Sequence, residues 1–212
     1  MSEINFAQVF IAFVVLLFSL TIHEMAHAWT ADRLGDPTAR LLGRVSLNPL
    51  VHADLIGTVV FPLVALVSGV PLIGWAKPVP VNIRRLRHER RDYVLVAAAG
   101  PASNVVLAVV AAVVLAAFPV SPMFGEPNTS APVAASLRLA VRLNILLAVF
   151  NMLPIPPLDG GNVLSGLLPP RFAAALNQIR PYGFLLLYAL LLTDGFYYLV
   201  VQPSNFLLSW LT

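Results

Sequence analysis

Residues 6–31 read FAQVFIAFVVLLFSLTIHEMAHAWTA, an apolar run that carries three ionisable side chains near its end. The run is long enough for a helix that crosses about 30 Å of hydrocarbon. His23, Glu24 and His27 form an HExxH pattern within it. Ionisable groups are costly at membrane depth and usually mark functional sites there. The run therefore predicts a membrane helix that carries a reactive site.

The composition of the 212-residue chain indicates an integral membrane protein. Hydrophobic residues make up 58% of it and charged residues only 11%, with a mean hydropathy of +0.83. A soluble domain carries roughly 25% charged residues. No long polar block separates the apolar runs, so we expect residues 1–212 to form a single membrane-embedded domain. The absence of cysteine excludes disulfides, thiolate metal ligands and thiol nucleophiles.

The other apolar runs predict an all-α membrane bundle. Three further runs are long enough to span the bilayer: residues 93–118, 133–152 and 181–201. A fifth run, residues 55–73, is interrupted by two glycines and two prolines, which favour a bent or re-entrant element over a straight helix. We therefore expect about four transmembrane helices and one re-entrant segment.

The basic residues predict the orientation of these runs. If residues 55–73 enter and leave by one face, 11 of the 13 Lys and Arg residues lie on the cytoplasmic side, as the positive-inside rule favours. The other two, Arg138 and Arg142, begin the run 133–152, and we expect them to snorkel to the outer interface. The net charge of +3 thus concerns topology and predicts no nucleic-acid partner. A five-span model stays open.

Two short stretches suggest extended structure beside the re-entrant segment. Residues 40–48 (RLLGRVSLN) and 75–82 (WAKPVPVN) are punctuated by glycine or proline. Pro78 and Pro80 have no N–H and are compatible only with an edge strand. The pattern predicts a short membrane-associated β element.

The HExxH pattern has the spacing of a zinc site. On a helix, residues four apart lie on one face, so His23 and His27 can bind the same ion, and Glu24 beside them can take a proton from water. A catalytic zinc also needs a third protein ligand. Asp159 is the best candidate, in the stretch NMLPIPPLDGG at residues 151–161. The residues alone leave open an equal alternative, in which Asp159 caps a helix over residues 162–168.

Three motifs in sequence order now identify a family resemblance. HExxH is followed by GPxxN at residues 100–104 and by NxxPxPxxDGG at residues 151–161. Together they closely resemble the site-2 protease family of intramembrane metalloproteases. The resemblance implies that His23, His27 and Asp159 bind Zn²⁺, that Glu24 is the general base, and that Asn151 donates to the substrate carbonyl or its oxyanion.

The family resemblance also implies how the helices and strands are arranged. Its first two motif helices are antiparallel and joined on the cytoplasmic side, which agrees with a re-entrant segment 55–73 and an active site near that side. Its members place strands between these helices to hold substrate in extended form, so an edge strand at 75–82 could take up an unwound segment by strand addition. This chain looks like a minimal form, without a PDZ or CBS domain.

Three polar residues have weaker assignments. Asn104 either lines the site or is a helix-packing amide. His52 fits an interfacial turn, and alternatively approaches the zinc to occupy its open position. Asn144 lies seven residues before Asn151, so both could line the cavity from one helix face.

The sequence thus predicts an intramembrane zinc metalloprotease, with one Zn²⁺ per chain, that cleaves transmembrane protein substrates in a prokaryotic cell membrane. Two alternatives stay open: a membrane transporter or metal-permeation protein, and an inactive relative that acts as a scaffold. The sequence does not give the oligomeric state, the substrate or the trigger for cleavage.

Overall fold

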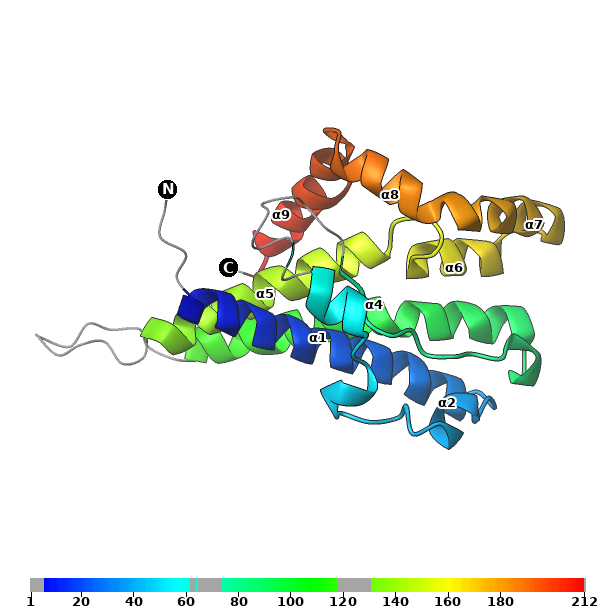
Figure 1. Ribbon diagram of the computed structural model, residues 1–212, viewed down its shortest axis with the longest axis horizontal. Helices are drawn as coiled ribbons and strands as arrows, with labels where there is room; N and C mark the ends of the chain where they lie inside the picture. Colours follow the sequence, from blue (N-terminus) through cyan, green and yellow to red (C-terminus); the bar gives the residue numbers. More distant parts are fainter. Residues whose placement is uncertain (1–5, 62–63, 65–73, 118–130, 212) are drawn as a thin grey trace, which may run out of the picture.

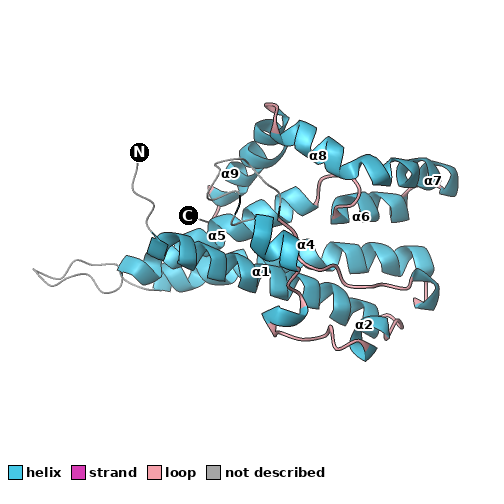
Figure 2. Ribbon diagram, in the orientation of Figure 1, coloured by secondary structure: helices cyan, strands magenta, loops and turns pink. Residues whose placement is uncertain are grey.

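The fold is known from a computed structural model, which describes residues 6–61, 64, 74–117 and 131–211. Over these residues the chain is helical, and no strand occurs among them (Figures 1 and 2). The α-helices are α1 (Phe6–Arg33), α2 (Thr38–Leu41), α4 (Glu89–Ala117), α5 (Ala131–Asn151), α6 (Asp159–Leu167), α7 (Pro170–Ile179), α8 (Gly183–Leu191) and α9 (Gln202–Leu208). Short 3₁₀ turns occur at Pro49–Val51, Ile83–Arg85 and Arg180–Tyr182, and π-helical turns at Leu55–Val60 and Tyr197–Val201.

Among the described residues three helices are long and apolar enough to cross a membrane, and they coincide with three of the four predicted spans. Their candidate spans are Gln8–Arg33, Glu89–Ala117 and Pro132–Asn151. The three helices run along the long axis of the molecule (Figure 1). α4 packs against α1, α5 and α6, and buries mainly small residues along its length, including Ala97, Ala108 and Ala112. Small side chains let helices approach closely where lipid removes the hydrophobic driving force. α4 is therefore the helix against which the site is built.

The predicted fourth span, residues 181–201, is wrong as a single helix. The chain forms α8, turns at residues 192–194, and continues through Tyr197–Val201 into α9. α8 has nine residues, or about 14 Å at 1.5 Å per residue, which is too short to span the bilayer. The turn holds the polar pair Thr193 and Asp194 followed by Gly195, and the hydroxyl of Thr193 donates back to Ala189. Hydropathy alone cannot detect this local break.

The predicted β element is also wrong. Residues 40–48 begin in α2, and Gly43 then turns the chain at a φ of 69°. Residues 75–82 stay outside helices until Ile83 and are called here the strap. The strap does not pair with a second strand among the described residues, because the N–H groups of Trp75, Lys77 and Val79 bond to a turn, a loop and a side chain. The predicted re-entrant segment 55–73 lies mostly outside the described residues, which show only that it starts as the π-helical turn Leu55–Val60.

Hydrogen bonds from separate parts of the chain hold the strap. The Trp75 N–H donates to the Gly57 carbonyl and the Lys77 N–H to the His52 carbonyl. The buried guanidinium of Arg44 donates to the carbonyls of Lys77 and Pro78, at 2.9 and 3.0 Å. These bonds use N–H and carbonyl groups that an added substrate strand would need, so this arrangement of the strap does not favour strand addition.

Candidate metal centre

α1 presents two buried imidazoles side by side, as the HExxH spacing predicts. His23 and His27 are one turn apart, and they are only 4% and 8% exposed. Their Nε2 atoms are 3.1 Å apart. Both rings face α4, the central helix of the bundle.

A tight turn brings Asp159 to the same point. Residues 151–161 leave α5 and return as α6, which begins at Asp159. A Cβ on Gly160 or Gly161 would overlap with backbone atoms of this turn, so the turn requires both glycines. The N-cap position of α6 is Leu158, and Asp159 is the first residue of the helix itself. The helix-cap alternative for Asp159 is therefore not what the structure shows.

The three candidate ligand atoms form a nearly regular triangle. Oδ2 of Asp159 lies 3.1 Å from Nε2 of His23 and 3.3 Å from Nε2 of His27, and the two Nε2 atoms are 3.1 Å apart. Tetrahedral zinc with bonds of about 2.0–2.1 Å separates its ligand atoms by about 3.3 Å. Among the described residues these three side chains form the one group of His, Cys, Asp or Glu that could hold a metal ion.

The hydrogen bonds around the triangle turn its three atoms into acceptors. Nδ1 of His27 lies 2.7 Å from the Val96 carbonyl, and Nδ1 of His23 lies 2.6 Å from Oδ1 of Asn104. A carbonyl oxygen only accepts, so each Nδ1 carries a proton, and each Nε2 is the nitrogen that remains to bind a metal ion. Three acceptors packed this closely repel one another unless a cation lies between them. The donor set and its spacing fit zinc.

The Asp159 carboxylate is suited to this role. Burial raises the pKa of its carboxyl, but the adjacent imidazoles of His27 and His23 lower it to about 2. The N-terminus of α6 also favours a negative charge at this position. Asp159 is therefore ionised at neutral pH, and its Oδ2 has no hydrogen-bond donor among the described residues.

Gly100 of α4 leaves the space in which the two imidazoles meet. A Cβ built on Gly100 would lie 2.5 Å from Nε2 of His23 and closer still to Nε2 of His27. The next residue, Pro101, has no N–H and removes one helical hydrogen bond from the same turn. The GPxxN motif therefore brings the α4 backbone up to the candidate ligand atoms.

A chain of buried amides fixes the orientation of His23. Asn104 accepts from His23 and donates through Nδ2 to Oδ1 of Asn144, at 2.8 Å. Asn144 donates in turn to the hydroxyl of Ser19, at 2.9 Å. Asn104 and Asn144 are 0% and 2% exposed. Asn104 thus contacts a candidate ligand directly, whereas Asn144 lies one step behind it and links α5 to α1.

The strap contacts Glu24. The Val79 N–H donates to Oε2 of Glu24, at 3.0 Å. Pro78 and Pro80 on either side have no N–H, so Val79 supplies the donor in this part of the strap. Glu24 adjoins His23 in sequence and is thereby held at the edge of the candidate metal centre.

Two further predicted site residues point elsewhere. Nδ2 of Asn151 donates to the Leu147 carbonyl of its own helix, at 3.0 Å, so this amide must rotate to reach a substrate. His52 is buried, and its Nε2 lies 2.8 Å from the Ser46 carbonyl. His52 is therefore part of the turn before the π-helical segment and does not join the metal-ligand group.

Three contributors to the site were not identified from the sequence: the space at Gly100, the Val79 N–H and the buried Arg44 that holds the strap. Gly100 lies in a recognised motif, so the motif could have indicated its role. The role of the Val79 N–H could not be predicted, because the type of a residue does not indicate what its backbone N–H group contacts. Arg44 resembles the other loop arginines until its burial is known.

The chain has clear relatives among known proteins, although no solved structure matches it. The family model "Peptidase family M50" matches residues 11–130 and 121–192. The protein named "Putative zinc metalloprotease YwhC" of Bacillus subtilis (strain 168) is 38% identical over 180 residues, which cover 85% of this chain and 79% of the relative. "Putative zinc metalloprotease Rip2" of Mycolicibacterium smegmatis is 32% identical over 196 residues, which cover 91% of this chain and 71% of the relative. The matched residues include all three motifs around the metal centre, and the chain belongs to peptidase family M50.

Proposed function

We propose that the chain is an intramembrane zinc metalloprotease that hydrolyses peptide bonds within or near the transmembrane segments of membrane proteins. The observation that carries this proposal is the convergence of the His23, His27 and Asp159 acceptor atoms beside Glu24. Their helices have the length and composition of membrane spans, or adjoin one. Membership of a peptidase family agrees with the proposal.

Each residue has a role that its environment supports. His23, His27 and Asp159 hold one zinc ion, which supplies a Lewis acid when bound. Glu24 takes a proton from the attacking water and returns it to the leaving amine. The Val79 N–H holds the Glu24 carboxylate in place between these two transfers. Asn151 stabilises the developing oxyanion once its amide turns away from Leu147.

Metal removal and restoration test the proposal. We expect the chain, purified in detergent and reconstituted with a single-span substrate, to contain about one zinc per chain and to cleave the substrate. Dialysis against a chelator should abolish cleavage, and added Zn²⁺ should restore it. Reconstituted chain that holds zinc and transports it without cleavage would favour the transporter alternative. Chain with zinc and neither activity would favour the scaffold.

A second expectation concerns Asn104. Asn104→Ala removes the acceptor that keeps the proton on Nδ1 of His23, so zinc affinity should fall about 10–100-fold, the range for lost outer-shell partners. Competition with a chromophoric chelator measures this affinity. Asn144→Ala is the matched control, because it breaks the next bond in the chain and leaves the His23 contact. It should lower affinity much less, and equal losses in both variants would indicate a packing defect.

A further inference from the structure

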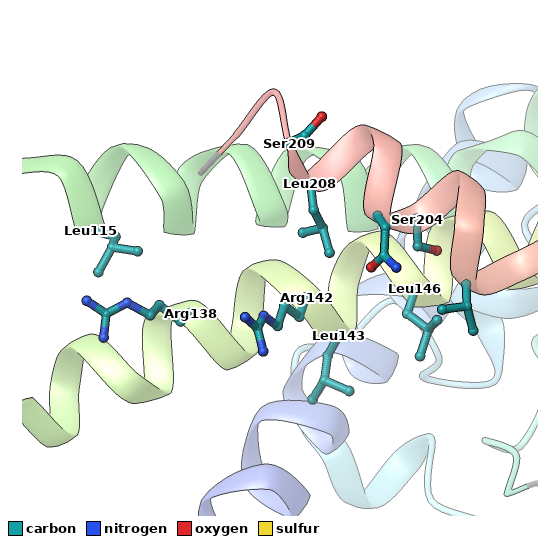
Figure 3. Close-up of a pocket in the computed structure, with 10 residues that line it drawn as sticks. Leu115, Arg138, Arg142, Leu143, Leu146, Ser204, Leu208 and Ser209 are labelled. Carbon is teal, nitrogen blue, oxygen red and sulfur yellow. The ribbon is translucent and has the colours of Figure 1, made fainter. Parts of the chain in front are cut away.

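Away from the metal centre, a cavity of about 840 Å³ lies between α4, α5 and α9 (Figure 3). We call it the α5–α9 cavity. Its volume is in the range of small-molecule sites. It is lined by Leu115, Arg138, Arg142, Leu143, Leu146, Val201, Ser204, Asn205, Leu208 and Ser209. The lining therefore combines two cations and several polar groups with an apolar surface.

The two cations have no acidic partner among the residues that the structure describes. Arg138 and Arg142 are one turn apart on α5, and neither makes an ion pair or a side-chain hydrogen bond within the described part of the chain. They lie in the first turns of α5, seven and eleven residues after its first residue, where snorkelling brings a guanidinium to the membrane interface. An unpaired cation there can bind an anionic group at the level of the lipid headgroups. They are also the two basic residues that the positive-inside rule does not explain.

A third side chain in the cavity lacks a partner. Ser204 is 3% exposed, and its Oγ forms no hydrogen bond. Figure 3 shows Ser204 on α9 above Leu146 of α5, with Arg142 and then Arg138 farther along the cavity. Buried hydroxyls almost always have a partner. The unpaired Oγ therefore independently indicates a polar ligand in the cavity.

The residues that line and adjoin the α5–α9 cavity indicate which kind of ligand it binds. The leucines of the lining lie beside exposed apolar residues of α9 and of the turn that follows it: Phe206 and Trp210 are 61% and 77% exposed. Tryptophan favours the interface where lipid headgroups lie, and Trp210 directly follows Ser209 of the lining. Two guanidiniums and a hydroxyl suit a phosphate with net negative charge, and the apolar wall suits an acyl chain.

We propose that the α5–α9 cavity is a binding site for an anionic phospholipid. Arg138 and Arg142 donate to its phosphate, Ser204 supplies a further hydroxyl donor, and one acyl chain lies along the leucines of α4 and α5. The site is separate from the metal centre, and the proposal does not depend on proteolysis.

Native mass spectrometry of the full chain in non-ionic detergent, titrated with phosphatidylglycerol, tests the site. We expect one retained lipid in the wild type. The double variant Arg138→Gln/Arg142→Gln should bind it at least about tenfold more weakly, because two charge-assisted contacts are lost. The control Arg91→Gln/Arg171→Gln removes the same charge from exposed positions outside the lining and should bind as the wild type does. Ser204→Ala should weaken binding about threefold, without lowering the melting temperature of the lipid-free protein, since its hydroxyl has no protein partner.

Three results would overturn the proposal. The double variant could retain the lipid as the wild type does. Phosphatidylcholine could bind as tightly as phosphatidylglycerol, which would remove the role of net charge. Millimolar inorganic phosphate could displace the lipid, which would assign the cavity to free phosphate. The expected result is that inorganic phosphate does not compete, because it has no apolar part.

Discussion

The Gly100→Ala variant is expected to fold and to bind no zinc. The added methyl group would lie between the two imidazoles, 2.5 Å from Nε2 of His23 and nearer to Nε2 of His27. The rings must rotate away from each other, so their lone pairs no longer meet at Asp159. Alanine is the better helix former by about 1 kcal/mol, so α4 itself should not be weakened. We expect zinc affinity to fall by more than the roughly 10–100-fold typical of a lost outer-shell partner, because the ligand atoms themselves are displaced, and cleavage to fall to background.

Zinc content by elemental analysis and a chelator competition measure this effect. Gly195→Ala is the matched control, because its Cβ would also meet a neighbour closely, at 2.8 Å from Cδ1 of Leu190, in a turn far along the chain from the site. It should retain zinc and activity. Stoichiometric zinc in Gly100→Ala would mean that the ligand atoms do not meet against α4.

The pairing of His23 with His27 could be predicted because its information is local: the two residues are one helical turn apart. The residues alone left Asp159 open between a metal ligand and a helix cap, and the family resemblance was needed to expect it beside the two histidines. The long spans were also predictable, since each is a continuous apolar run whose length matches the bilayer. The histidine pair and the long spans depend on neighbours in sequence and on the solvent, and they need no knowledge of the rest of the fold.

The features that were missed depend on distant contacts. The break in 181–201 is made by Thr193, Asp194 and Gly195, which barely change the hydropathy of a 21-residue window. The strap has the composition of an edge strand, but its N–H groups bond to Gly57, His52 and Glu24. Extended backbone and a β-strand differ only in the partner of these groups, and that partner is set by tertiary structure.

The Glu24→Gln variant should keep its zinc and lose cleavage. Glutamine has nearly the same shape as glutamate, and its amide oxygen can accept the Val79 N–H as Oε2 of Glu24 does. The strap and the ligands should therefore stay in place. The amide cannot take a proton from water, so the rate of cleavage should fall about 10²–10⁴-fold, the contribution of a general base. Single-turnover cleavage of a reconstituted single-span substrate measures the rate, and elemental analysis measures the zinc.

Two more variants distinguish loss of the general base from other causes of reduced cleavage. Glu89→Gln makes the same change at an exposed position at the start of α4 and should cleave as the wild type does. Glu24→Asp keeps a carboxylate but shortens the side chain by one methylene, which lengthens its contact with the Val79 N–H. It should retain zinc and an intermediate rate, because the base is present but poorly placed. Wild-type cleavage by Glu24→Gln would show that another group accepts the proton. A rate for Glu24→Asp as low as that for Glu24→Gln would show that the position held by the strap matters as much as the charge.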